Sequence, residues 1–314
     1  MKIDTLKLKV EYTEIKNKDI FAFCTKSEDD KITEYLKLNK YIQGINSIAI
    51  FDNLTAIIQI SSKILGKRHL EGITAGNIAD VLTELKKYID FDVKNTTVLR
   101  ADIFTDIEVS DKKEYIRQLQ LLNNISRYKI VEYYPEKSII FEKDNKTVKD
   151  RIIFYDKEQE LQDRINNAKD EEKKESLIKI LAVDGIENLI RVELNINTFA
   201  KLRTLLKIQD LDLLTVLKSK ENPIKNLINK YFIKDNPVNI ANTEDEVYIR
   251  YYKAELQDHY CDMEKIKAGI RRAYKGNDRK IKKQYEYLEN AKANIMKKYN
   301  INSISILENL NKIA

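Results

Sequence analysis

The sequence predicts an α+β protein with a sheet-centred domain over residues 1–215 and a mostly helical, basic region over residues 216–314. Runs with the two-residue period of strands alternate with helix-like runs over the first part of the chain. Beyond about Asn197 the pattern is helical almost throughout, with breaks expected at Asn222-Pro223 and Asn236-Pro237. A chain of 314 residues, 43% of them hydrophobic, can build the cores that two such parts require.

The composition excludes several broad classes of protein. With 7 Gly and 3 Pro, the chain is not collagen-like, and its hydrophobic content argues against disorder. Cys24 and Cys261 lie far apart and outside any zinc or disulfide pattern, which favours a reducing cytoplasm. The sequence has neither a signal-like N-terminus nor an apolar run of the roughly 20 residues that span a bilayer, so we expect a cytoplasmic protein without a membrane partner. The net charge of +6 is too modest to indicate nucleic-acid binding by itself.

The N-terminal third is expected to form strands and one helix. Residues Leu6 to Tyr12 alternate apolar and polar side chains, as a half-buried strand does. Two β-rich runs between Ser47 and Ile60 are separated by Asp52-Asn53, which predicts a hairpin. Residues 75–89 have a helical pattern in which one face carries Ile78, Val81, Leu82 and Leu85.

The middle of the chain continues the alternation. Residues Thr96 to Val109 give a strong strand signal, and a helix over roughly residues 111–124 follows, with Ser110 as its N-cap. A long charged helix is expected to run to about Lys174. The remaining strands are predicted at Tyr128 to Tyr134, Ser138 to Glu142, Arg151 to Tyr155 and Asn188 to Ile196.

The C-terminal region carries a basic segment. Residues Lys265 to Lys283 contain a single acid, and Tyr274, Tyr285 and Tyr287 lie in or beside them. Basic side chains neutralise phosphates and tyrosine rings can stack on bases, so DNA contacts are expected here. A solvated helix face would have the same composition. The expected contact residues are Arg271, Arg272, Lys280, Lys282 and Lys283.

Three short motifs place charged residues on predicted strands. In the first, Arg100, Asp102, Phe104 and Asp106 share one face, because side chains alternate along a strand. A carboxylate on a buried strand is costly unless it binds a cation or is well paired. An Arg–Asp pair at a strand edge would explain this motif equally well.

The second motif is centred on Tyr155. If its strand extends to Lys157, the phenol and the ammonium point the same way, and Lys157 could favour the phenolate or hold a phosphate oxygen. Glu160 follows three residues later. Because the chain has 18 tyrosines, an ordinary sheet tyrosine is the alternative.

In the third motif, Arg191, Glu193 and Asn195 share a strand face, which a solvent-facing amphipathic strand would also explain. Together the three motifs supply carboxylates, a tyrosine and a lysine within one domain. This set of groups suits metal-assisted phosphoryl transfer, in which a hard divalent cation takes oxygen ligands and tyrosine can act as a covalent nucleophile.

These segments resemble the filamentous-phage gene II replication initiators. IDTLKLKV is similar to their start, TTVLRADIFTDIEV to their Arg-x-Asp strand, FYDKEQELQ to their tyrosine motif and NLIRVELNI to their Arg-x-Glu strand. Plasmid replication initiation factors with a Tyr-Asp-Lys motif look similar too, and they carry a second Asp four residues after the first. The resemblance covers roughly the first 215 residues in motif order.

The resemblance implies a rolling-circle replication initiator, which nicks and rejoins one strand of a supercoiled origin. In this family a tyrosine keeps the 5′ phosphate and releases a 3′ hydroxyl, so the sheet-centred domain would be catalytic, with Tyr155 as nucleophile and Lys157 beside it. The implied cofactor is Mg²⁺ or Mn²⁺. Asp102 and Glu193 match the family's acidic positions, Asp106 matches only the plasmid pattern, and Glu160 is a ligand or a structural partner.

The resemblance also implies DNA as the main partner. Arg100 and Arg191 are the expected DNA contacts within the motifs. The origin would be bound as single strand or supercoiled duplex in the cytoplasm of a bacterial host, whose replication helicase and polymerase are further expected partners.

The sequence departs from this family in two places. Phage members often have a Gly-His-Asn or Gly-Asn-Asn element after an early strand, whereas GKRHLEG here puts His69 elsewhere, and His69 is not assigned to a metal site. His259 is the only other histidine, which excludes the His-x-His metal motif of the wider nicking-enzyme superfamily.

Two further hypotheses compete with the nicking enzyme. One is a non-catalytic origin-binding or copy-control protein of related fold, and the other is a helix-rich interaction protein with a basic tail. The joint presence of Tyr155, Lys157, Asp102 and Glu193 favours the enzyme over the first. Acidic residues within apolar strands argue against the second.

Overall fold

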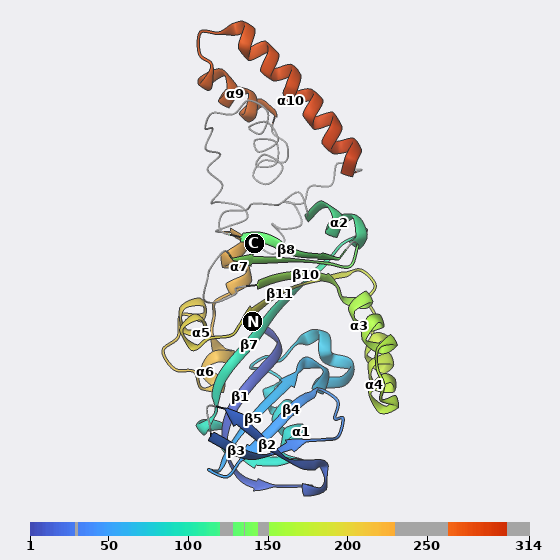
Figure 1. Ribbon diagram of the computed structural model, residues 1–314, viewed down its shortest axis with the longest axis vertical. Coiled ribbons are helices and arrows are strands. Elements are labelled where there is room, and N and C mark those ends of the chain that lie inside the picture. The colour runs from blue at the N-terminus through green and yellow to red at the C-terminus, as the bar shows by residue number, and fades with distance from the viewer. Residues whose placement is uncertain (29–30, 120–127, 135, 144–150, 230–262, 300–314) are drawn as a thin grey trace. The chain divides into compact units, whose positions relative to one another are not determined.

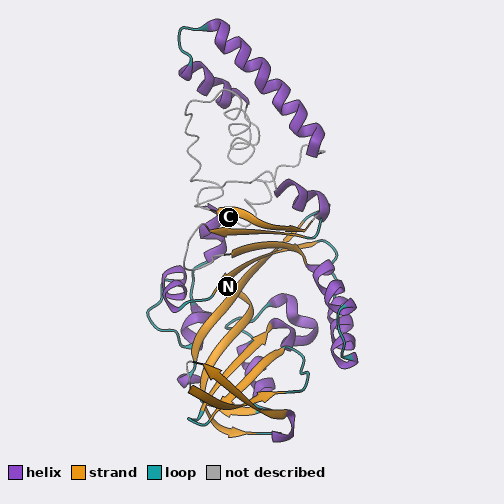
Figure 2. Ribbon diagram, in the orientation of Figure 1, coloured by secondary structure: helices purple, strands orange, loops and turns teal. Residues whose placement is uncertain are grey.

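The α+β prediction is confirmed by the computed structural model (Figures 1 and 2), which combines antiparallel strands with helices. The structure describes residues 1–28, 31–119, 128–134, 136–143, 151–229 and 263–299. The chain divides into two compact units, which are discontinuous in sequence. The first unit comprises residues 1–106, 157–187 and 191–223, and the second comprises residues 107–156, 188–190 and 224–314. The sequence-based division at residue 215 stays a prediction.

Strands of the first unit are hydrogen-bonded in the order β2-β3-β4-β5-β1-β7-β11, and β6 pairs with β1. The predicted hairpin at Asp52-Asn53 is confirmed, and Leu54 completes its turn with a φ of 58°. Three of these strands, β2, β3 and β6, were not predicted. Their bounds are β1 Lys2–Ile15, β2 Phe21–Glu28, β3 Lys31–Leu38, β4 Ile45–Phe51, β5 Thr55–Ser61, β6 Ile89–Phe91, β7 Thr97–Glu108 and β11 Leu189–Ile196.

Helical segments accompany this sheet. The predicted apolar face is present in the helix α1, where Ile78, Val81 and Leu85 are buried. The segments are η1 Lys18–Ile20, η2 Ser62–Glu71, α1 Ile78–Leu85, η3 Val93–Asn95, α3 Lys157–Asn166, α4 Glu171–Leu181, α5 Phe199–Leu206 and α6 Leu213–Lys218.

The prediction of one long helix up to Lys174 was wrong, because two helices, α3 and α4, occupy this stretch. Asp170 caps α4 by accepting a hydrogen bond from the amide of Lys173, and an Asp in this position favours a fresh helix start over continuation. The two helices share a small core, against which Leu70 of η2 packs. The buried residues of this core are Leu161, Ile165, Leu177, Ile180 and Ile186.

The second unit contains a three-stranded antiparallel arrangement in the order β10-β9-β8. Its apolar side includes Phe141 and Phe154, whose rings meet edge to face with centroids 5.8 Å apart. The elements are α2 Lys112–Leu119, β8 Tyr128–Tyr134, β9 Ser138–Lys143, β10 Arg151–Asp156, α9 Met263–Ala273 and α10 Asp278–Tyr299.

Some predictions fall partly outside the described residues. The end of the helix predicted over residues 111–124 and the break at Asn236-Pro237 are among these. The other predicted break is confirmed, because Pro223 is the first residue of α7 (Pro223–Leu227), where a missing amide proton costs nothing. Within the described residues, no helix is both long enough and apolar enough to cross a membrane.

Candidate active site

Ionisable side chains from three neighbouring strands and two helical segments gather in the first unit. The strands β1, β7 and β11 supply four carboxylates and an arginine, η2 supplies a lysine and a histidine, and α3 supplies a lysine and a glutamate. We call these residues the charged cluster: Asp4, Lys63, His69, Asp102, Asp106, Lys157, Glu160, Arg191 and Glu193.

A β-bulge turns Asp4 toward this cluster. In a regular strand Asp4 would share a face with Leu6, Leu8 and Val10, which are buried in the apolar core. In the pairing of β1 with β7, Ile3 lies opposite Ile103 and Thr5 lies opposite Asp102. Asp4 is therefore the extra residue of the bulge and has no partner of its own in β7. A bulge re-aims the side chain of its extra residue, and here it moves a carboxylate off the apolar face.

Arg191 is the central cation of the cluster, and its side chain is fully buried. Its Nε and Nη2 donate to both carboxylate oxygens of Asp106 at 2.7 and 2.9 Å, and its Nη1 donates to Asp4 Oδ1 at 2.9 Å. The guanidinium also lies over the ring of Phe104, with 3.7 Å between the guanidinium carbon and the ring centroid. The predicted shared face of Phe104 and Asp106 is therefore present, and Arg191 is not exposed to an approaching DNA strand.

Arg100 holds Asp102 in the same two-pronged way, with hydrogen bonds of 2.9 and 2.8 Å. The carboxylate is buried, whereas 37% of the arginine side chain is exposed. Burial raises the pKa of Asp102, although the hydrogen bond and charge of Arg100 oppose this rise. Arg100 thus remains open to solvent while it neutralises the carboxylate next to Asp4.

Glu193 of β11 is crowded by other carboxylates. Burial, together with repulsion from Asp4 and Asp102, raises the pKa of Glu193 to about 7. Asn195 donates a hydrogen bond of 2.8 Å to Glu193 Oε1, as expected for residues on one strand face. Three carboxylates that repel one another at the meeting point of three strands are an arrangement that a bound cation would relieve.

Lys157 begins α3, because β10 ends at Asp156. The strand does not reach Lys157, so the condition for the expected arrangement is not met. The alternation of side chains along a strand therefore does not place the phenol of Tyr155 and the ammonium of Lys157 on one face. The Lys157 side chain is only 1% exposed, and its Nζ lies 3.0 Å from Glu160 Oε2. Burial alone would raise the pKa of Glu160, but Lys157, Lys63 and Arg164 lower it to about 2.

Lys63 and His69 were not selected from the sequence. Both side chains are buried, and burial together with the charge of Lys157 lowers the pKa of Lys63 to about 8 and that of His69 to about 3. His69 is thus neutral, and neither ring nitrogen has a hydrogen-bond partner among the described residues. No sequence pattern singles out these two residues, because the packing of η2 against the core shared by α3 and α4 brings them to the cluster.

Asp4 interacts with three cations of the cluster. Burial alone would raise the pKa of Asp4, but Lys157, Arg191 and Lys63 outweigh it and hold the pKa far below its ordinary range. Ser62 supports the carboxylate with a hydrogen bond of 2.9 Å to Oδ1. The sequence does carry one signal for Asp4. The next three even-numbered positions of the strand are apolar, and an acid at such a position is unexpected.

The donor set can be tested for a divalent cation. Carboxylate oxygens suit Mg²⁺ and Mn²⁺, and Mn²⁺ also accepts imidazole nitrogen. Asp4, Asp102, Glu193 and the partnerless nitrogens of His69 supply such donors, and they fit a cation in kind. Among the described residues, however, no three such side chains already form a ligand shell. Arg191 engages Asp106, and Lys157 with Arg164 engages Glu160. Arg100 and Arg191 also engage Asp102 and Asp4, so a cation would share these two carboxylates with an arginine.

Tyr155 lies in β10 of the second unit and is half-buried. Phe154 and Ile152, on the opposite strand face, are fully buried. The backbone of Tyr155 pairs with Ser138 of β9. Only Asp156 separates Tyr155 from Lys157 in the chain.

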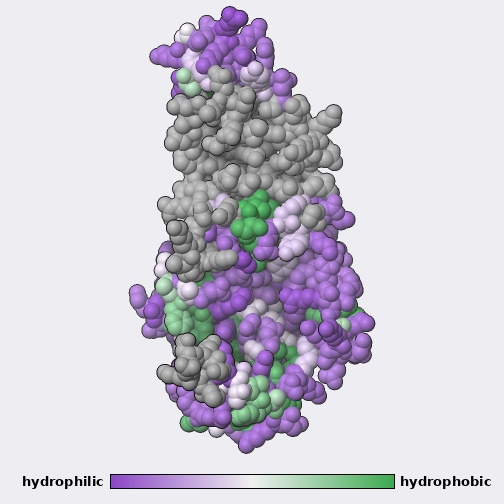
Figure 3. All heavy atoms as spheres, viewed as in Figure 1, coloured by the Kyte–Doolittle hydropathy of each residue, from purple (hydrophilic) through white to green (hydrophobic). Residues whose placement is uncertain are grey.

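The basic C-terminal residues also belong to the second unit. Arg271 and Arg272 lie at the end of α9, and Lys280, Lys282 and Lys283 lie in α10. Two of the tyrosines expected to stack on bases also contact these lysines. Lys280 Nζ lies 4.9 Å from the centroid of the Tyr274 ring, and Lys283 Nζ lies 5.4 Å from that of the Tyr287 ring. The visible surface of α9 and α10 is largely hydrophilic (Figure 3).

A comparison with known protein families agrees with the sequence motifs. The family model described as the N-terminal part of the phage gene II replication-associated protein matches residues 12–211, more than half of the chain, which confirms the resemblance to gene II initiators. The chain is also similar to a solved structure of a rolling circle replication initiator protein from Geobacillus stearothermophilus. That similarity has 11% identity and a TM-score of 0.37, and it covers 73% of this chain and 84% of the other. A comparison with curated proteins finds no match.

Proposed function

Because the chain belongs to the family of gene II replication-associated proteins, we propose that it initiates rolling-circle DNA replication by nicking and rejoining one strand of an origin. One observation supports this most strongly. Residues from all three motif segments, Asp102, Lys157 and Glu193, enter the same charged cluster, although they are far apart in sequence. Buried ionisable groups are costly, and such a concentration is typical of a site that handles charged substrates.

The proposed reaction is a transesterification at Tyr155. Its phenolic oxygen attacks the scissile phosphorus, the bond from phosphorus to the 3′ oxygen breaks, and the 5′ phosphate stays on the tyrosine. The phenol loses its proton, and the departing 3′ oxygen gains one to become a hydroxyl that primes synthesis. Rejoining runs the same exchange in reverse, with a 3′ hydroxyl attacking the phosphotyrosine.

The buried lysines suit the charge changes of this reaction. Negative charge grows on the phosphate oxygens during attack, and an ammonium held in a site that excludes water stabilises it more than water would. Lys157 is such an ammonium and is joined to Tyr155 through a single residue. Lys63 supplies a second buried ammonium near the same carboxylates.

A divalent cation, when bound, would polarise the phosphate as a Lewis acid. Asp4, Asp102 and Glu193 would hold it, with His69 as a nitrogen donor. Asp106 and Glu160, which the sequence also suggested, would instead orient Arg191 and Lys157. Arg191 is a positioning residue in this proposal, since it fixes Asp4 and Asp106 from inside the fold, and Arg100 is the arginine of the motifs that a DNA strand could reach.

A non-catalytic origin-binding protein of related fold is the alternative. Binding to a DNA backbone needs exposed cations and has no use for two buried carboxylates, Asp4 and Asp102, beside the half-buried Glu193, which would repel phosphates. The charged cluster therefore favours the nicking enzyme. Origin DNA is the proposed partner, and a host helicase and polymerase would act on the released 3′ end.

A plasmid nicking assay tests the proposal. Supercoiled plasmid carrying the replicon that encodes this protein is incubated with the full chain and Mg²⁺, and the products are separated on a gel. We expect nicked circles with protein linked to the 5′ end, and we expect Tyr155→Phe to abolish nicking while origin binding survives. Tyr134→Phe is the matched control, because Tyr134 is 53% exposed and lies in β8 of the same unit.

Two results would contradict the proposal. Wild-type rates of nicking by Tyr155→Phe would remove Tyr155 from the mechanism. Specific origin binding by the wild type without any nicking would favour the non-catalytic alternative.

A further inference from the structure

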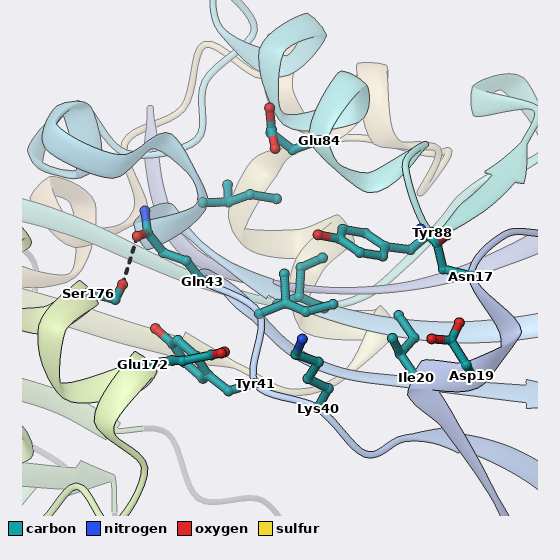
Figure 4. A pocket seen from close by; sticks show the side chains of 13 residues that line it. Asn17, Asp19, Ile20, Lys40, Tyr41, Gln43, Glu84, Tyr88, Glu172 and Ser176 are labelled. Carbon is teal, nitrogen blue, oxygen red and sulfur yellow. Dashed lines mark hydrogen bonds between the residues drawn. The ribbon is translucent and has the colours of Figure 1, made fainter.

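A second site lies in the first unit, apart from the charged cluster. It is a cavity of about 650 Å³ between the β3–β4 loop, the turn after α1 and the helix α4. Figure 4 shows the Tyr88 ring projecting into it, with Lys40 and Tyr41 below and Gln43 and Ser176 at the other end. Cavities of this size accommodate small organic ligands.

The cavity is structurally fixed at its Gln43 end. Ser176 Oγ donates to Gln43 Oε1 at 2.7 Å, and Gln43 Nε2 donates to the carbonyl of Lys63 at 2.9 Å. Gly44 keeps the neighbouring loop tight, because a β-carbon there would lie 2.0 Å from the backbone nitrogen of Ile64. The same short segment therefore borders both sites, with Lys63 in the charged cluster and Ile64 lining the cavity.

The charges of the cavity disfavour phosphate as its ligand. Its lining includes three carboxylates, Asp19, Glu84 and Glu172, against the single ammonium of Lys40. Glu84 is partly offset by Lys87, 2.7 Å away, but the remaining balance is still negative. A phosphate would be repelled, whereas a neutral group with N–H donors would be attracted.

Its apolar and aromatic parts suit a flat ring. Tyr41 and Tyr88 lie on different sides of the hollow in Figure 4. Isoleucines, among them Ile42 and Ile64, also line it. Burial raises the pKa of Tyr41, so its phenol remains neutral. Aromatic side chains stack on nucleobases, and carboxylates accept hydrogen bonds from exocyclic amino groups.

We propose that this cavity binds one unpaired, amino-bearing nucleobase, adenine, cytosine or guanine, of the DNA strand that the protein handles. The proposal rests on the proposed function for the source of the ligand, since nicking and strand displacement produce single-stranded DNA. Stacking comes from Tyr88, and the carboxylates select against thymine, which has no amino group. The bound base would fix the register of the strand, while the phosphates are contacted elsewhere.

Nucleoside binding to the full chain tests this directly, because nucleosides carry no phosphate. Deoxyadenosine, deoxycytidine, deoxyguanosine and thymidine are each titrated and followed by calorimetry. We expect at least one of the three amino-bearing nucleosides to bind at least about tenfold more tightly than thymidine, since a good pair of base contacts discriminates by this order. Tyr88→Ala should weaken this binding by roughly five- to hundredfold, as loss of a stacking ring does.

Controls separate ring stacking from general loss of structure. Tyr88→Phe keeps the ring and should bind like the wild type, and Tyr134→Ala removes an exposed tyrosine of the second unit and should also have no effect. With single-stranded 20-mers, Tyr88→Ala should leave the salt dependence of binding unchanged, because no phosphate contact is lost.

The outcomes distinguish this proposal from the proposed function. A protein that nicks its origin but binds no nucleoside overturns the base site alone. Nucleoside binding that is unchanged in Tyr88→Ala also overturns the base site. Binding of a basic peptide such as tetralysine in the cavity, without binding of nucleosides, would overturn it as well. Selective nucleoside binding without nicking supports the base site and overturns the proposed enzyme.

Discussion

Arg191 donates a hydrogen bond of 2.9 Å to Asp4, a residue 187 positions earlier in the chain. The same guanidinium donates two hydrogen bonds to Asp106, so it links β11 to both β1 and β7. Since its side chain is completely buried, its charge is balanced by these carboxylates rather than by water. The pair is therefore the structural centre of the charged cluster.

Arg191→Leu should destabilise the protein by about 3–5 kcal/mol, because it leaves two carboxylates without their buried partner. Urea unfolding followed by circular dichroism measures the loss. Arg68→Leu is the matched control, since the pair of Arg68 and Asp80 is half-exposed and such pairs contribute about 1 kcal/mol at most. Equal losses in the two variants would mean that burial of Arg191 adds nothing to its importance.

Asp4→Asn and Glu193→Gln should each weaken Mn²⁺ or Mg²⁺ binding by about tenfold or more, and Asp102→Asn should act in the same direction. A neutral amide is a poorer ligand for a hard cation than a carboxylate. Calorimetric titration of the metal-free protein measures this without reference to activity. Asp106→Asn is the control, because Asp106 also pairs with Arg191 but is not a proposed ligand. Unchanged affinity in the first three variants would place the cation elsewhere.

Cation affinity should depend on pH through Glu193. Its pKa of about 7 means that a proton competes with the cation below neutral pH, so affinity should rise about tenfold per pH unit up to about 7 and then level off. The stability of the cation-free protein should depend on pH in the opposite direction. The raised pKa of Glu193 stabilises the fold below the ordinary glutamate value of 4.5, and this contribution is lost as the pH rises through about 7. Glu193→Gln should flatten both dependences, and a steep affinity profile that persists in this variant would assign the proton to another group.

Neutralising the basic C-terminal residues should weaken DNA affinity more than it slows strand cleavage. Each lost phosphate contact should reduce the salt slope by about 0.9 on duplex DNA, equally for cognate and random sequences. The five substitutions are Arg271, Arg272, Lys280, Lys282 and Lys283 to Gln. Binding titrations at several salt concentrations measure the slope.

A matched variant for this experiment neutralises exposed lysines of the first unit. The control positions are Lys67, Lys94, Lys169, Lys173 and Lys179. An unchanged slope in the C-terminal variant, or an equal change in the control, would remove α9 and α10 as a specific DNA contact.

The sequence by itself determined the elements with strong local patterns. The strands β7 and β11 and the hairpin of β4 and β5 follow from alternation and turn chemistry, which are properties of neighbouring residues. The same alternation correctly placed Phe104 with Asp106, and Glu193 with Asn195, on shared strand faces. The motif order, read along the chain, was enough to indicate the family.

Only the tertiary structure decided how the charges meet. Asp4 joined the cluster because the pairing of β1 with β7 required a bulge, and a bulge depends on the partner strand rather than on local sequence. Lys63 and His69 entered because η2 packs against the core of α3 and α4. Burial of Arg191, and the pKa of Glu193 that follows from crowded carboxylates, likewise arise from segments far apart in sequence. Strand parity is encoded locally, whereas the electrostatic environment of a side chain is the sum of distant charges and excluded water, which only the assembled fold fixes.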